Sequence, residues 1–272
     1  MLMQESKNGI NYTVQGDGDP VILIHGMAAS LYDWEALIPA LVTSGYRAYA
    51  LDLPGHGGSA KPDDPKYYNA ESVYNKMNDW IDSLALTQSP ILVGHSLGGY
   101  FALKFSLQRS QMLRAMVLID PFYTLQQVSP ILRMFNRRPE LSIKVLDLIP
   151  DGLVNFVMGM DPISKNRYTE TARHHIADDF KRASPCIMYT TASINDLTPH
   201  LSKIETPTLV IWGQRDLTLA TSSYPRLVEK IPKASGHSLP GCGHQPHIGR
   251  PKLIHQLLLE FIERLPVDDD LA

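Results

Sequence analysis

Short runs of apolar residues, each bounded by turn-forming residues, recur along the chain. They occupy residues 21–24, 46–51, 91–93, 115–119 and 208–212. Runs this short and this continuous are typical of strands that are covered on both faces, as in a parallel sheet. The pattern therefore predicts a mostly parallel β-sheet.

Two longer segments carry apolar residues at helical spacing. In the stretch from Ala70 to Leu86, one face would hold Val73, Met77, Trp80, Ile81 and Leu84. In the stretch after Pro251, one face would hold Ile254, Leu257, Leu258, Phe261 and Ile262. Pro251 stands where a helix would begin, at the position that tolerates its missing N–H. Strands alternating with helices predict an α/β fold.

The alternation stops between about Tyr123 and His200, where the apolar residues have helical rather than strand-like settings. We interpret this stretch as a helical insertion between two strands of the sheet. The expected organisation is a core domain of residues 1–122 and 201–272 with an inserted helical domain of residues 123–200.

Composition narrows the classes of function. The 272 residues are 44% hydrophobic and 19% charged, with a formal net charge of −3. This balance gives no electrostatic basis for binding nucleic acid or an anionic membrane surface. The chain has neither the apolar core of a secretory signal nor the roughly 18 consecutive apolar residues of a membrane span, so we expect a soluble, cytoplasmic protein.

The cysteine pattern indicates neither a disulfide framework nor a zinc site. Cys186 and Cys242 are far apart in sequence and have no metal-ligand spacing. Two buried thiols are expected, and no metal or cofactor.

The strongest chemical signal is the segment Gly94-His95-Ser96-Leu97-Gly98, directly after the apolar run 91–93. A serine between two glycines suits a tight strand-to-helix turn, because the residues two positions either side of it pass each other without side chains. Such a turn would expose the Ser96 hydroxyl as a nucleophile.

A serine hydroxyl needs a base, and the base needs a group to orient it. His244 lies in a glycine-rich loop before the last predicted helix, and Asp216 follows the run 208–212. The carboxyl ends of parallel strands share one sheet edge, where sites gather. Two alternatives stay open: His247 as the base, and Asp120, at the end of the run 115–119, as the acid.

The order Ser, Asp, His with the Gly-x-Ser-x-Gly turn resembles the α/β-hydrolase family. Two further segments match it: His25-Gly26 after the run 21–24, and the loop Asp52-Leu-Pro-Gly-His-Gly-Gly-Ser59. The resemblance extends from about Val21 to Leu265. It implies a sheet of about eight strands flanked by helices, with a helical cap inserted after the sixth strand.

The resemblance also implies an oxyanion hole made by the backbone N–H groups of Met27 and Leu97. Each such donor contributes on the order of 3 kcal/mol to stabilising a tetrahedral intermediate. Where many relatives carry a glutamate after the catalytic histidine, this chain has Gly249. A role for that carboxylate is therefore absent.

Other candidate residues have simpler interpretations. His25 and His56 are expected to brace loops, and His95 to point away from Ser96. Ser30 and Ser59 lack flanking glycines and are expected to cap turns or helices. His174 and Asp178 lie four apart on a possible helix, a spacing that can hold a metal, but a solvated polar face is the simpler reading.

A serine at position 96, rather than an aspartate, excludes the branches of the family that displace halide or open epoxides. The sequence therefore predicts a carboxylesterase that acts on a small-molecule ester through an acyl-enzyme on Ser96. Three alternatives use the same pocket: hydrolysis of a carbon–carbon bond in a diketone-like substrate, acyl transfer to an alcohol or peroxide, and a ligand-binding module without catalysis.

The apolar residues of the insertion either line the substrate cleft or hold the cap to the core. The candidates for the cleft are Met134, Phe135, Phe156, Met158 and Met160. No nucleic-acid or membrane partner is expected, and the oligomeric state is left open.

Overall fold

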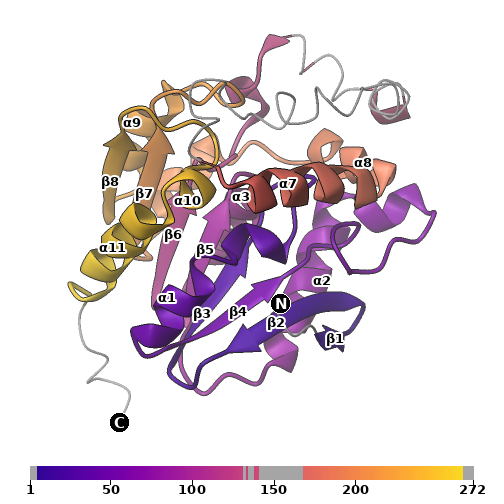
Figure 1. The fold of residues 1–272 in the computed structure, drawn as a ribbon. Coiled ribbons are helices and arrows are strands. Elements are labelled where there is room, and N and C mark those ends of the chain that lie inside the picture. Colours follow the sequence, from indigo (N-terminus) through magenta and orange to yellow (C-terminus); the bar gives the residue numbers. More distant parts are fainter. Residues whose placement is uncertain (1–4, 131–132, 134–137, 141–167, 266–272) are drawn as a thin grey trace.

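The computed structural model describes residues 5–130, 133, 138–140 and 168–265, and a single eight-stranded sheet organises them (Figure 1). The strand order is β1-β2-β4-β3-β5-β6-β7-β8. The strands are β1 (Glu5–Lys7), β2 (Ile10–Gln15), β3 (Asp19–Ile24), β4 (Tyr46–Leu51), β5 (Ile91–His95), β6 (Ala115–Ile119), β7 (Thr208–Gly213) and β8 (Ala234–Leu239). All neighbours from β4 to β8 pair in parallel, whereas β1 and β2 are antiparallel additions at one edge. The predicted α/β fold with about eight strands is confirmed.

The helices cover both faces of this sheet. They are α1 (Ile38–Thr43), α2 (Ala70–Ser83), α3 (Leu97–Arg109), α7 (Glu170–Arg182), α8 (Met188–Ala192), α9 (Ser223–Lys230), α10 (Pro246–Gly249) and α11 (Pro251–Ile262). Figure 1 shows α1 and α11 in front of the sheet. None of the helices in the described part of the chain combines the length and apolar composition that crossing a bilayer requires.

Alternate residues of the central strands supply two separate cores. On β5, Leu92 packs into the core beneath α2 and α3, whereas Ile91 and Val93 pack into the core beneath α1 and α11. Both sets are fully buried. Because successive side chains of a strand point to opposite faces, only an uninterrupted apolar run can fill two cores. This explains why the strands were recognisable as continuous runs.

The predicted helical faces are mostly buried, although Leu84, just past the end of α2, and Phe261 are only half-buried. On α2, Val73, Met77, Trp80 and Ile81 are nearly inaccessible to solvent. Asn69 caps this helix by accepting a hydrogen bond from the Ser72 N–H at 2.9 Å. Helix α11 begins at Pro251, as the sequence predicted.

Helix α3 approaches the sheet too closely for side chains. A Cβ atom on Gly98 would lie 2.1 Å from the carbonyl oxygen of Ile24 and 2.7 Å from that of His25, both at the end of β3. Glycine at position 98 therefore sets the distance between the start of α3 and the sheet.

The segment between β6 and β7 docks on loops of the sheet's carboxyl edge. The Ser30 hydroxyl donates to the Asp179 carboxyl of α7 at 2.5 Å, and the Ser184 N–H donates to the Gly55 carbonyl at 2.8 Å. The proposed limits of the insertion, 123–200, remain a prediction. The five suggested cleft residues, Met134, Phe135, Phe156, Met158 and Met160, lie outside the described residues.

The Asp179 carboxyl is buried beside other acidic groups. Burial raises its pKa to about 7 from an ordinary value of 3.8, and the nearby Asp33 and Asp52 add to the shift, whereas the Ser30 hydrogen bond and Arg182 oppose it. Between about pH 4 and pH 7 the folded protein therefore keeps a proton that the unfolded chain releases. Stability falls as the pH rises through this window.

We expect Gly98→Ala to destabilise the protein by about 3 kcal/mol. The new methyl group would clash with the backbone of Ile24 and His25, which cannot move aside. The roughly 1 kcal/mol by which alanine normally favours a helix does not offset this clash. Urea unfolding followed by fluorescence measures the change. Gly249→Ala is the matched control, since its nearest contact would be an ordinary 3.7 Å. Equal stability of Gly98→Ala and wild type would contradict the close packing.

Asp179→Asn should stabilise the protein at pH 8 by about 2 kcal/mol while changing little at pH 4.5, because the amide accepts the Ser30 hydrogen bond without ionising. Urea unfolding at both pH values tests this. Asp178→Asn, an exposed neighbour on the same helix, is the control. A stabilisation that is equal at both pH values would show that ionisation of Asp179 is not the cause.

Candidate active site

Ser96 lies in the tight turn between β5 and α3. Its backbone has φ 48° and ψ −112°, a conformation that residues other than glycine rarely adopt. A Cβ atom on Gly94 would lie 2.5 Å from the carbonyl oxygen of Gly98, so the two flanking positions do pass each other without side chains. The Ser96 side chain is half-buried at the carboxyl edge of the sheet.

Backbone hydrogen bonds hold this turn on both sides. The Ser96 N–H donates to the Ile119 carbonyl at 3.0 Å, and the Phe122 N–H donates to the Ser96 carbonyl at 2.9 Å. Both partners belong to the end of β6 and the segment after it. The strained residue is thus fixed by its neighbour strand, as strain at functional sites generally requires.

Met27 and Leu97, the predicted sources of oxyanion donors, belong to the two segments next to Ser96. Leu97 is the first residue of α3, so its N–H has no acceptor within the helix and stands at the positive end of the helix dipole. A Cβ atom on Gly26 would lie 3.2 Å from the Ser96 Cβ, which places the loop containing Met27 directly against Ser96. The Met27 and Leu97 positions therefore flank the serine.

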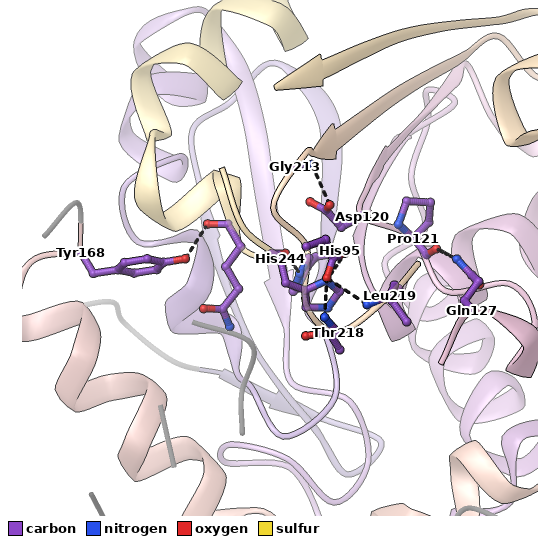
Figure 2. A network of polar contacts seen from close by, with 11 residues as sticks. His95, Asp120, Pro121, Gln127, Tyr168, Gly213, Thr218, Leu219 and His244 are labelled. Atoms are coloured by element: carbon purple, nitrogen blue, oxygen red, sulfur yellow. Dashed lines mark hydrogen bonds and ion pairs between the residues drawn. The ribbon is translucent and has the colours of Figure 1, made fainter. Parts of the chain in front are cut away.

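Asp216 and His244 form a buried pair. The Nδ1 atom of His244 lies 2.8 Å from Oδ2 of Asp216, and both residues are more than nine-tenths buried. Oδ1 of Asp216 accepts from the N–H groups of Thr218 at 2.8 Å and Leu219 at 2.9 Å (Figure 2). A carboxylate held by these donors requires an N–H at His244 Nδ1, which leaves the Nε2 lone pair to act as a base.

The loops after β7 and β8 bring this pair together. The Gln214 N–H donates to the Leu239 carbonyl at 3.1 Å, and the Arg215 N–H donates to the Cys242 carbonyl at 2.8 Å. These backbone bonds hold the acid loop against the histidine loop. Asp216 and His244, which are 28 positions apart in sequence, are therefore held in contact.

Asp120, the alternative acid, lies beside this pair, but its described hydrogen bond is with the backbone of Gly213. It is completely buried, and its Oδ1 accepts from the Gly213 N–H at 2.8 Å (Figure 2). One ligand atom from each of Asp120, Asp216 and His244 lies within 4.8 Å of the other two. The described hydrogen bond of His244 Nδ1 goes to Asp216.

His247, the alternative base, faces away from Asp216. Its ring packs on Trp34 with centroids 4.7 Å apart, and its Nε2 lies 3.7 Å from Oδ2 of Asp33. The ring also packs on His95 at 4.4 Å. The structure therefore pairs Asp216 with His244 rather than with His247.

His95 makes a contact that could not be predicted from the sequence. Its Nε2 lies 2.8 Å from the backbone carbonyl of His244, so the ring donates to the loop that carries His244. Burial lowers the pKa of His95 well below the ordinary value of 6.5, and the imidazoles of His247 and His244 add to this effect. His95 is thus a neutral imidazole that ties the turn at Ser96 to the loop of His244.

Three of the potential metal ligands, His95, Asp216 and His244, have other hydrogen-bond partners. Two groups of three possible ligands occur among the described residues, Asp33 with His95 and His247, and Asp120 with Asp216 and His244. His95 already donates to a carbonyl, and Asp216 and His244 bind each other. His174 and Asp178 are both exposed on α7.

The loop that begins at Asp52 braces the segment that follows β3. Oδ1 of Asp52 accepts from the Leu31 N–H at 2.7 Å, and Oδ2 accepts from the Gly58 N–H at 2.7 Å. Nε2 of His25 accepts from the Leu53 N–H at 2.9 Å. His25 therefore links the two loops.

His56 and the two serines also have structural contacts. Burial lowers the pKa of His56 to about 3, and its Nδ1 lies 3.0 Å from the Pro54 carbonyl. Ser30 caps the short helix η1 (Leu31–Trp34), and the Ser59 hydroxyl donates to the Asp52 carbonyl at 2.6 Å. These residues hold loops in place.

The cysteines and Gly249 lie at the margins of the site. Cys242 is buried, whereas Cys186 is only half-buried because it lies in the docked segment between α7 and α8; neither is in a disulfide. Gly249, at the end of α10, lies beneath the Tyr168 ring, whose hydroxyl is 3.4 Å from the Gln245 carbonyl (Figure 2).

Comparisons with known proteins agree with this architecture. Residues 19–251 match the model of the α/β hydrolase fold family. The chain is 27% identical over 264 residues to a 2-hydroxy-6-oxo-6-(2'-aminophenyl)hexa-2,4-dienoic acid hydrolase of Metapseudomonas resinovorans, covering 93% of this chain and 87% of the relative.

Solved structures are similar over nearly the whole chain. A bromoperoxidase from Bacillus anthracis has a TM-score of 0.80 at 26% identity, covering 93% of this chain and 95% of that one. A thermophilic esterase from Thermogutta terrifontis has a TM-score of 0.80 at 23% identity, covering 98% of both chains, and shows the shared fold. With its eight-stranded sheet, the turn at Ser96 and the match over residues 19–251, this chain belongs to the α/β hydrolase fold family.

Proposed function

We propose that this protein is a serine hydrolase that cleaves carboxylic esters through an acyl-enzyme on Ser96. The observation that carries the proposal is the buried pair of His244 and Asp216, which leaves an imidazole lone pair available at the same sheet edge as a strained, half-buried serine. Ser96 is the nucleophile, His244 the base and Asp216 the group that orients the base.

The first half of the reaction acylates the enzyme. Oγ of Ser96 attacks the ester carbonyl while Nε2 of His244 takes its proton, and the carbonyl oxygen becomes an oxyanion. The N–H groups of Met27 and Leu97 donate to that oxygen. The intermediate collapses as the C–O bond to the alcohol breaks, and His244 returns the proton to the departing alkoxide.

The second half repeats these steps with water. His244 removes a proton from water, the resulting hydroxide attacks the acyl carbon, and the bond to Ser96 breaks as its oxygen regains a proton. Asp216 stays ionised and stabilises the imidazolium that forms in each half. No step requires a metal or an organic cofactor.

Hydrolysis of a carbon–carbon bond is the second candidate, and the relative from Metapseudomonas resinovorans favours it, because its name gives a dienoic acid as substrate. Further relatives at 26% identity are named 2-hydroxy-6-oxo-dienoate hydrolases. This reaction would use the same three residues, with the carbanion of the leaving group protonated instead of an alkoxide. The likeness to a bromoperoxidase adds a second acceptor to test, namely hydrogen peroxide in place of water.

Ser96→Ala and His244→Ala should each lower kcat for p-nitrophenyl acetate about 10⁴-fold or more, and Asp216→Asn about 10³- to 10⁴-fold, because these side chains act as a unit. Steady-state kinetics with matched thermal unfolding curves measure this. Ser110→Ala, an exposed serine just past the far end of α3, is the control. A Ser96→Ala variant as active as wild type would eliminate the serine mechanism.

A substrate panel separates ester cleavage from the second candidate. We expect the wild type to hydrolyse p-nitrophenyl esters of increasing acyl length and to leave a 2-hydroxy-6-oxo-dienoate uncleaved, with turnover followed by absorbance. Added hydrogen peroxide should form no peracid. An enzyme that is inert toward every ester but cleaves the dienoate would replace our proposal with carbon–carbon hydrolysis.

A further inference from the structure

Two carboxyl groups meet at the ends of neighbouring strands β6 and β7, although the proposed function needs only one. Asp120 is completely buried and Asp216 is 8% exposed. One oxygen of each, together with a ring nitrogen of His244, lies within a 4.8 Å cluster. Two carboxylates at this distance in a buried site do not both remain ionised, because their charges repel and neither is solvated.

The hydrogen bonds show which carboxyl carries the negative charge. Asp216 receives three N–H donors, from Thr218, Leu219 and His244. Asp120 receives one, from the Gly213 N–H to its Oδ1. Since hydrogen-bond donors stabilise the charged form of a carboxyl, the carboxyl with more N–H donors is the ionised one. Asp216 is therefore the carboxylate and Asp120 the acid.

The second oxygen of Asp120 needs an acceptor if it carries a proton. Oδ2 is buried and, among the described residues, accepts no N–H or O–H. The titratable groups that face Asp120 are Asp216 from the loop after β7, and His244 and Cys242 from the loop after β8. Each carboxylate oxygen can accept two bonds, so Oδ2 of Asp216 has capacity beyond its bond to His244.

We propose that Asp120 is a neutral carboxylic acid that keeps its proton, donates a hydrogen bond through it to Asp216, and so acts as a positioning residue for the Ser96 site. Burial and the neighbouring Asp216 charge raise the pKa of Asp120 well above 3.8, in agreement with the hydrogen-bond pattern. The inference rests on the proposed function, because it assigns a partner to the orienting acid of the same site.

The backbone at Asp120 is built for this placement. Asp120 has φ 42°, a left-handed conformation that aspartate tolerates better than most residues. Its N–H continues the sheet by donating to the Ile211 carbonyl at 2.9 Å. The side chain of Gln127 holds the following loop. It donates to the Pro121 carbonyl at 2.9 Å (Figure 2), and it accepts from the Tyr123 N–H at 2.6 Å. The acid is thus held at a fixed angle to Asp216.

A neutral donor in this position has a chemical consequence. It gives the Asp216 carboxylate a fourth hydrogen bond without placing a second negative charge near His244. The carboxylate then keeps its orientation while His244 changes from imidazole to imidazolium and back. An ionised Asp120 would instead repel Asp216 and compete for His244.

The protonation state can be read by infrared spectroscopy without any substrate. At pH 8 the wild type should show the carbonyl stretch of a protonated carboxylic acid, and Asp120→Asn should lose that band. Asp179→Asn is the control, because it removes a second carboxyl whose pKa is raised and should keep the band. A wild-type spectrum without the band, or one that Asp120→Asn leaves unchanged, would overturn the assignment.

Kinetics of two substitutions test the positioning role. Asn at 120 supplies an acceptor for Gly213 and a neutral donor for Asp216, so Asp120→Asn should keep kcat/KM for p-nitrophenyl acetate within about threefold of wild type. Asp120→Ala should lower it about ten- to a hundredfold, because a hydrogen bond to a charged group is lost.

The outcomes separate this inference from the proposed function. If Asp120→Asn loses as much activity as Asp216→Asn, Asp120 is an ionised acid and the inference is wrong. If the wild type cleaves no ester but shows the band that Asp120→Asn abolishes, the proposed function fails and the protonation assignment stands. If Asp120→Ala does not fold, the infrared band of the protonated acid and the kcat/KM of Asp120→Asn still test the assignment.

Discussion

The backbone turn at Ser96 packs strand β5, strand β3 and helix α3 more closely than side chains would allow. Cβ atoms at Gly94 and Gly98 would lie 2.5 Å and 2.1 Å from backbone oxygens. This close approach turns the chain sharply at Ser96, at the rim of the sheet, and starts α3 with the very next residue. The proposed nucleophile and one proposed oxyanion donor, the Leu97 N–H, therefore come from a single steric constraint.

The remaining parts of the site are attached to that turn by backbone hydrogen bonds. The segment after β6 binds both the N–H and the carbonyl of Ser96, and His95 binds the carbonyl of His244. The loops after β5, β6, β7 and β8 are thus joined to one another rather than placed independently. Residues separated by more than a hundred positions in sequence can keep a defined geometry because these loops leave from adjacent parallel strands.

The central strands could be predicted from the sequence because each of them fills a core on both faces of the sheet and is therefore continuously apolar. Continuous apolar runs marked β3 to β7, and Pro251 marked the start of α11. Strands β1, β2 and β8 were not recognisable by the same reasoning. Glu5–Lys7 and Ala234–Leu239 are mostly polar and largely exposed, and Ile10–Gln15 alternates apolar with polar residues. Edge strands bury one face or none, so their composition carries little signal.

For the site, sequence spacing predicted Ser96, Asp216 and His244 as candidates, and the structure places the last two in contact. The sequence could not separate Asp120 from Asp216 as the acid, because both follow a strand at the same sheet edge. Only their hydrogen bonds in the folded protein distinguish them. The contact between His95 and His244 was equally hidden, since a ring nitrogen bound to a backbone carbonyl leaves no pattern in the sequence. Cleft residues depend on packing of the inserted segment and stay predictions.

Covalent labelling tests the central claim, that Ser96 is an activated nucleophile, most directly. A fluorophosphonate reacts with such a serine by forming an Oγ–P bond and releasing fluoride, so intact-protein and peptide mass spectrometry identify the attacked residue. The account predicts one adduct per chain, on the peptide that contains Ser96, absent in Ser96→Ala and formed far more slowly in His244→Ala. Absence of any adduct in folded wild type, or an adduct on Ser30 or Ser59 instead, would contradict it.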